Sequence, residues 1–128
     1  MTSEWERAVR TGDRDSLRRL HVAGADVNAR DQYGQTGLMI AAREGRPEIV
    51  RALLEAGAAL DHTAKDRLSA VMLAVLNGHA EIVQLLTEAG ADLTIQGSGA
   101  PGFAGKTALD LAEAQERADL TAILRRSR

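Results

Sequence analysis

Apolar residues recur at helical spacing in two kinds of short segment that alternate along the chain. Segments 36–45 and 69–78 combine apolar residues with several alanines, whereas segments 46–57 and 79–90 carry larger aliphatic residues. The stripe in the first long segment consists of Ile49, Val50, Leu53 and Leu54. Spacings of three and four residues place such side chains on one face of a helix. The pattern therefore predicts pairs of short helices, the first of each pair with small residues that let a neighbouring pair approach closely.

Residues suited to helix ends flank these segments. Thr36 and Ser69 occupy N-cap positions, where a hydroxyl accepts hydrogen bonds from first-turn amides. Gly45 and Gly78 are expected to end the first helices, because a left-handed cap is easiest for glycine. Pro47 suits the first turn of the following helix, where its missing amide hydrogen costs nothing. Each predicted helix pair thus has a start and a stop in the sequence.

The spacing of the glycines shows that the pair is repeated. Six of the twelve glycines fall into two series, each with a period of 33: Gly12, Gly45 and Gly78, and Gly24, Gly57 and Gly90. A fixed period of this length is typical of stacked repeat proteins. One such unit cannot bury both of its faces, so it needs neighbours on either side.

Three short motifs carry a resemblance to a known family. Residues 34–38 fit Gly-x-Thr-x-Leu, residues 78–83 fit Gly-His-x-Glu-Ile-Val, and residues 24–28 read Gly-Ala-Asp-Val-Asn. Over nearly its whole length the chain resembles ankyrin repeat proteins. The resemblance implies an all-α fold, an ankyrin-repeat solenoid of stacked helix–turn–helix units joined by β-hairpin loops. We expect one domain over residues 1–128, with repeats at about 1–30, 31–63, 64–96 and 97–128.

The chain departs from the family pattern at three positions of the repeat. The proline after the threonine is replaced by Gly37, Ala70 and Ala108. The histidine three residues after the threonine is replaced by Met39, Met72 and Asp110, so its hydrogen bonds are lost or replaced. Arg67 stands where the first hairpin has Gly34, and the shape of that turn is expected to change.

The amino-terminal unit, residues 3–28, is expected to be a capping repeat. Ser3 and Glu6 have the spacing of a capping box, and Asp13 suits the N-cap of the second helix. Trp5 occupies an apolar position of the repeat and is predicted to lie in the core. Arginines make the second helix polar, as an outer face in water requires; they are Arg14, Arg18 and Arg19.

The amino-acid composition of the chain limits the kinds of partner that it can be expected to bind. The net charge is −2 with acids and bases interspersed, whereas a nucleic-acid site needs clustered lysine and arginine. There is no cysteine, which excludes disulfides and thiol chemistry and fits a reducing compartment. Residues 1–7 lack an apolar signal segment, and no run approaches the roughly 20 apolar residues of a membrane span. We therefore expect a soluble cytoplasmic protein that binds neither nucleic acid nor membranes.

The predicted hairpins carry side chains of interest. Tyr33, the only tyrosine, should sit near a hairpin tip, and exposed tyrosine is effective at interfaces. Its ring either contacts a partner or folds back onto the next hairpin. Leu68 aligns with Gln35 and Leu76 with Arg43, so both leucines should face the concave groove. They are either exposed there as a binding patch or packed beneath the longer loop that follows.

The last hairpin is longer than the others. The interval from Thr94 to Thr107 is 13 residues, against 8 from Asn28 to Thr36, so five residues are inserted in segment 96–105. The insertion is glycine-rich and holds the only phenylalanine, Phe103. Insertions in repeat arrays map to loops on one face, often the binding face.

Part of this insertion has a second interpretation. Residues 100–107 resemble a degenerate phosphate-binding loop in which Lys106 and Thr107 would hold the phosphates. Such a loop needs a strand before it and a parallel sheet around it, yet only 21 residues follow Thr107. A lengthened hairpin explains the same residues, because Gly105 and Thr107 keep the register of the earlier repeats.

No other constellation predicts chemistry. The three histidines, His21, His62 and His79, stand at different places in the repeat and do not form a ligand set. His79 has the family's usual position at the start of a second helix, a structural role. The carboxylates form no positioned acid–base pair. We therefore expect no enzyme activity and no catalytic, cofactor or metal site.

The resemblance implies a non-catalytic module that binds an unidentified partner protein on its concave hairpin and first-helix face. We expect a monomer. The contact residues, carried over from the family's exposed positions, are predicted to be Gln32, Tyr33, Gln35, Arg43, Glu44, Lys65, Asp66, Leu68, Leu76, Asn77 and Phe103. The alternatives are a self-associating structural protein and nucleotide binding through residues 100–107.

Overall fold

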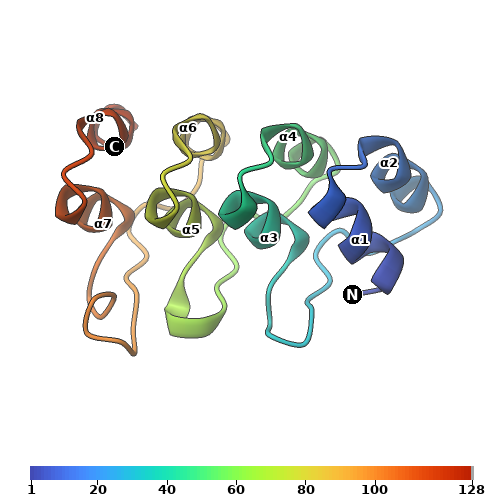
Figure 1. The fold of residues 1–128 in the computed structure, drawn as a ribbon, viewed down its shortest axis with the longest axis horizontal. Coiled ribbons are helices and arrows are strands. Elements are labelled where there is room, and N and C mark those ends of the chain that lie inside the picture. Colours follow the sequence, from blue (N-terminus) through green and yellow to red (C-terminus); the bar gives the residue numbers. More distant parts are fainter. Residues whose placement is uncertain (128) are drawn as a thin grey trace.

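The computed structural model describes residues 1–127, which contain eight α-helices, one short 3-10 helix and no strand. The elements are α1 (Ser3–Thr11), α2 (Arg14–Val22), α3 (Gly37–Glu44), α4 (Pro47–Glu55), η1 (Lys65–Arg67), α5 (Ala70–Leu76), α6 (Ala80–Glu88), α7 (Ala108–Ala114) and α8 (Ala118–Arg126). The helices form four pairs that stack side by side in one row (Figure 1). The all-α solenoid predicted from the repeat is confirmed.

The pairs build two layers with the core between them. The first helices of the pairs, α1, α3, α5 and α7, form one layer, and the second helices, α2, α4, α6 and α8, form the other (Figure 1). Each helix contacts its partner and the equivalent helix of the neighbouring pair. Ala41, Ala42 and Ala74 are completely buried, so these small side chains let the first helices pack closely.

The loops between pairs project from the first-helix layer as three hairpins (Figure 1). The first hairpin, residues 30–36, and the second hairpin, residues 63–69, each close with one antiparallel bridge between their end residues. The third hairpin, residues 96–106, holds the insertion. Its Ser98 amide donates to the Asp66 carbonyl at 2.8 Å, which ties the third hairpin to the second.

The second hairpin has the changed turn that Arg67 predicted. Asp66 and Arg67 adopt left-handed backbone conformations, with φ of 61° and 56°, close to the 78° of Gly34. Residues other than glycine rarely occupy this region. The arginine therefore keeps the direction of the turn, and the chain forms η1 instead of a tight glycine turn.

A second contact between repeats recurs along the stack. The left-handed glycine that ends or follows α1, α3 and α5 lies beneath the residue that N-caps the second helix of the next pair. The contacts are Arg46 on Gly12, His79 on Gly45 and Arg117 on Gly78. His79 also places its Nε2 3.0 Å from the Arg43 carbonyl oxygen. The structural role predicted for His79 is therefore a link between two repeats.

The predicted helix caps are confirmed in part. Thr36 Oγ1 accepts from the Met39 amide at 3.3 Å, as expected. Asp13 accepts from the Ser16 amide at 3.1 Å, as expected. The predicted cap of α5 is not formed by a side chain. Ser69 is at the N-cap position, but its buried Oγ has no hydrogen-bond partner in the described chain.

The capping box predicted at the amino terminus is wrong, because the N-cap residue of α1 lies one position earlier than expected. Thr2, rather than Ser3, caps α1 and accepts from the Trp5 amide at 3.2 Å. Ser3 is already inside the helix, so it cannot pair with Glu6 in a capping box. Trp5 is 2% exposed, which confirms its predicted place in the core.

Candidate functional site

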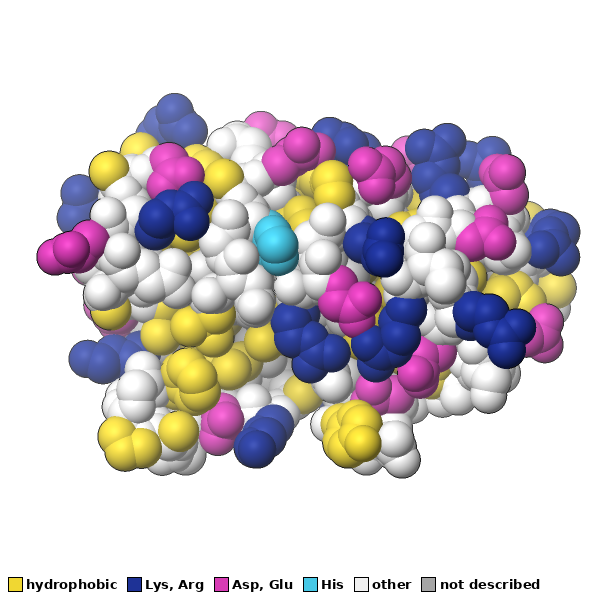
Figure 2. All heavy atoms as spheres, in the orientation of Figure 1, with side chains coloured by type: hydrophobic (Ala, Val, Ile, Leu, Met, Phe, Trp, Pro, Cys, Tyr) yellow, Lys and Arg dark blue, Asp and Glu magenta, His cyan; other side chains and the backbone are white. Residues whose placement is uncertain are grey.

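A cavity of about 400 Å³ lies between the first and second hairpins on the first-helix side of the molecule. Figure 2 shows this face hollowed between the two hairpins, with apolar, basic and acidic side chains around the hollow. We call it the inter-hairpin groove. Its lining residues are Arg10, Tyr33, Gln35, Arg43, Ala64, Lys65, Asp66, Leu68 and Leu73. They come from three successive repeats, so the groove exists only because the repeats are stacked.

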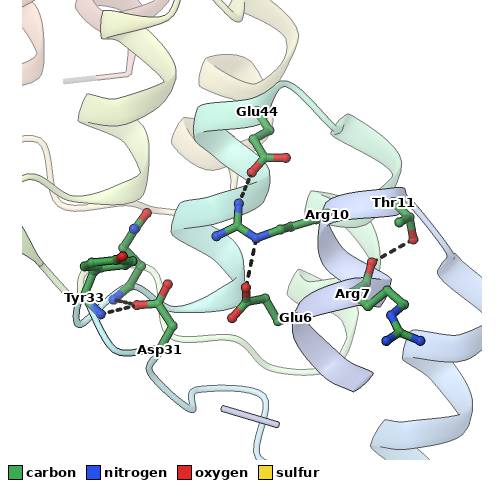
Figure 3. Close-up of polar contacts among 8 residues, drawn as sticks. Glu6, Arg7, Arg10, Thr11, Asp31, Tyr33 and Glu44 are labelled. Carbon is green, nitrogen blue, oxygen red and sulfur yellow. Dashed lines mark hydrogen bonds and ion pairs between the residues drawn. The ribbon is translucent and has the colours of Figure 1, made fainter. Parts of the chain in front are cut away.

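The first hairpin is held in shape by the side chain of Asp31. Its Oδ1 accepts from the Tyr33 amide at 2.9 Å and from the Gln35 amide at 2.8 Å. The Asp31 carbonyl accepts from the Gly34 amide at 3.0 Å. Figure 3 shows the carboxylate beneath the hairpin tip with the Tyr33 ring beside it. Tyr33 is 67% exposed, so of its two predicted placements the structure has the exposed one.

Arg10 of α1 forms one wall of the groove and is held by two carboxylates. Its Nε donates to Glu6 at 3.1 Å, and its Nη1 contacts Glu44 of α3 (Figure 3). The hydrogen bond that Arg10 donates to Glu6 raises the pKa of Arg10 above its ordinary value. The guanidinium is therefore a fixed cation whose charge is already balanced.

Two further cations of the groove are not balanced in this way. Among residues 1–127, Arg43 and Lys65 form no ion pair within 4 Å. Asp66 is the one carboxylate in the lining, and its Oδ1 lies against the backbone of Gly99 in the third hairpin. The lining thus holds three basic side chains and one acidic one, and of the basic ones Arg43 and Lys65 have no carboxylate partner within 4 Å among residues 1–127.

The floor of the groove is apolar. Ala64 and Leu68 of the second hairpin and Leu73 of α5 supply most of it, and the exposed surface of the walls is mostly apolar. Leu68 is 7% exposed, so of its two predicted placements the exposed one is excluded. It belongs to the main hydrophobic core of the chain. Leu76 is half-buried and packs against the same core.

The structure gathers six of the eleven predicted contact residues around the groove: Tyr33, Gln35, Arg43, Lys65, Asp66 and Leu68. Five lie outside its lining: Gln32, Glu44, Leu76, Asn77 and Phe103. Gln32 is exposed beside Tyr33, whereas Glu44 is engaged by Arg10. Asn77 bonds the Leu73 carbonyl at 2.9 Å, and Phe103 is half-buried in the third hairpin.

Sequence reasoning missed three lining residues, Arg10, Ala64 and Leu73. Arg10 belongs to the preceding repeat, and its position in the capping helix matches that of Arg43, 33 residues later. The repeat frame could therefore have identified it. No signal in the sequence marks Ala64 as part of a wall.

The segment resembling a phosphate-binding loop is engaged in helix capping. Thr107 Oγ1 accepts from the Asp110 amide at 3.2 Å, and Asp110 accepts from the Thr107 amide at 2.9 Å. This capping box uses the hydroxyl that a nucleotide-bound metal would need, and the described backbone before it is a hairpin rather than a strand.

Two features of the described part of the chain bear on metal binding and on membranes. Residues 1–127 hold no group of three or more potential metal-ligating side chains. Within the same residues, every helix is too short or too polar to cross a membrane.

Comparison with known proteins adds one finding. Residues 5–97 match a family model described as ankyrin repeats, in three copies. No curated protein matches the chain. The pair α7 and α8 lies beyond the matched residues but packs on α5 and α6 as the earlier pairs pack on each other.

Proposed function

Because this chain belongs to the ankyrin repeat family, whose repeats generally serve as protein–protein interaction modules, we propose that it is a non-catalytic module whose concave face binds a partner protein. The concave face consists of the hairpins and the first helices of the pairs. The inter-hairpin groove is a hollow on this face, and among residues 1–127 Tyr33 is the exposed large hydrophobic side chain that lines it.

One observation carries this proposal: hydrogen bonds within the chain brace the two hairpins that form the groove. The Arg30 guanidinium donates from one nitrogen to the Gly34 carbonyl at 2.7 Å and to the Thr63 carbonyl at 2.9 Å. This side chain joins the first hairpin to the start of the second. A surface fixed in advance loses little conformational entropy when it binds, which favours affinity.

The residues on the rim suit recognition of a polypeptide. Tyr33 offers a large ring and a hydroxyl with few rotatable bonds, which is the chemistry enriched at interface hot spots. Gln32 and Lys65 are exposed beside the groove and supply polar groups that can adapt to a partner backbone. The main contribution is expected from Tyr33, with the polar groups adding specificity.

The test compares three forms of the chain as baits in native extract. The first is wild type, and the second carries Tyr33→Ala with Lys65→Ala, both exposed residues of the concave face. The third carries Val22→Ala with Arg18→Ala, an exposed apolar residue and an exposed cation on α2. Leu68 is unsuitable as a surface probe because it is buried.

We expect a protein that wild type and the α2 variant retain equally and that the concave-face variant loses. Equal thermal melting curves of the three forms would show that folding is unchanged. A partner retained by the concave-face variant but lost by the α2 variant would contradict the proposal.

A further inference from the structure

The inter-hairpin groove combines two features that together specify an occupant. Its volume of about 400 Å³ lies within the range of small binding pockets, about 300–1,000 Å³. Its surface is mostly apolar and includes Ala64, Leu68 and Leu73. Such a cavity favours a large apolar side chain, since burial of apolar area is the main gain on association.

The charges on the walls add the second feature. Arg43 on α3 and Lys65 on the second hairpin both line the cavity, and neither is paired with a carboxylate of the described chain. Arg10 is neutralised by Glu6 and Glu44. The carboxylate of Asp66 lies against Gly99, beside the third hairpin. Among the described residues, no carboxylate therefore forms an ion pair with Arg43 or Lys65 beside the apolar floor.

We infer that the occupant is a partner segment in which a large apolar side chain stands next to one or two carboxylates. The apolar side chain enters the cavity, and the carboxylates face Arg43 and Lys65. Complementary charge of this kind fixes the register of a bound segment and rejects basic partners. The inference rests on the proposed function, because it names the partner chemistry of the same concave face.

The experiment selects ligands for the full chain from a random heptapeptide library displayed on phage. We expect enrichment of sequences that place Leu, Phe or Trp beside Asp or Glu. A synthetic copy of one such peptide is then titrated by fluorescence anisotropy into wild type and into Arg43→Glu/Lys65→Glu. The matched control is Arg18→Glu/Arg126→Glu, which makes the same charge change on α2 and α8.

The groove variant should bind the peptide at least about tenfold more weakly, because two attractive pairs become repulsive, while the control should match wild type. A peptide with lysine in place of its acidic residue should prefer the groove variant. Failure to enrich acidic–apolar sequences, or equal binding by the groove variant and wild type, would overturn the inference.

The outcomes also separate this inference from the proposed function. If Tyr33→Ala abolishes peptide binding but Arg43→Glu/Lys65→Glu leaves the affinity unchanged, the inference of an acidic partner segment is overturned. Binding of a partner at the concave face would then still be supported. If neither Tyr33→Ala nor the charge reversal changes the affinity for the peptides, both the inferred acidic segment and the proposed binding at the concave face are contradicted. Circular dichroism melting of each variant checks that the fold is intact.

Discussion

Replacing Gly45 with alanine perturbs a contact between two repeats without touching the groove. Gly45 ends α3 with a φ of 78°, and an added Cβ would lie 2.5 Å from His79 Cε1 of the next repeat. Gly57 provides a matched control. Its φ is 86°, and nothing lies within 4 Å of an added Cβ. The two substitutions thus share a backbone cost and differ in the contact with the neighbouring repeat.

The shared cost is that of a left-handed alanine, about 1–2 kcal/mol. Gly45→Ala adds a second cost, because the His79 ring must move and lose its 3.0 Å contact with the Arg43 carbonyl. One hydrogen bond of this kind contributes about 0.5–1.5 kcal/mol. We therefore expect Gly45→Ala to lower the free energy of unfolding by about 2–3 kcal/mol and Gly57→Ala by about 1–2 kcal/mol.

Urea denaturation followed by circular dichroism at the helical band measures both values. The slope of the free energy against urea should be the same for both variants, since each exposes the same surface on unfolding. In a His79→Ala background the excess cost of Gly45→Ala should disappear, because the ring it collides with is absent. Equal costs for Gly45→Ala and Gly57→Ala in the wild-type background would refute the link between repeats.

Two further predictions concern stability. Leu68→Ala should lower the free energy of unfolding by about 2–3 kcal/mol, whereas Tyr33→Ala should change it by less than about 0.5 kcal/mol; equal effects in urea denaturation would contradict the burial of Leu68. The hydrogen bond from the Ser16 hydroxyl, aided by the Ser16 amide, lowers the pKa of Asp13. Because the folded pKa is below the unfolded one, its stabilisation is complete at neutral pH and is lost as the pH falls through the folded pKa. The stability difference between wild type and Asp13→Ala should therefore shrink between about pH 5 and pH 2, and a difference independent of pH would count against this cap.

The helix pairs were predictable from the sequence because each one carries its own local signals. The glycine period, the N-cap at Thr36, the proline at Pro47 and the apolar stripes act within one repeat of about 33 residues. Boundaries were less certain. Thr2 and Ser3 are both acceptable caps in sequence, and packing of Trp5 into the core decides which one ends up outside α1.

The groove was predictable only in part because it depends on contacts between repeats. The hairpin positions Tyr33 and Lys65 follow from the repeat frame, but the frame does not say how far the second hairpin folds inward. The alignment of Leu68 with polar Gln35 makes an exposed position one of two expectations, yet the leucine, which directly follows η1, is buried in the main core. Arg10 lines the groove from a first helix of the preceding repeat, so the hairpin sequences alone do not indicate it.

The central claim is that the concave face between the first and second hairpins holds a partner, and backbone amide chemical shifts measured during titration with a selected peptide test it most directly. We expect the largest chemical-shift changes at Tyr33, Gln35, Arg43, Lys65 and Leu73. The amide shifts of the second helices should remain nearly unchanged. Shifts concentrated on α2, α4 and α6 would contradict it.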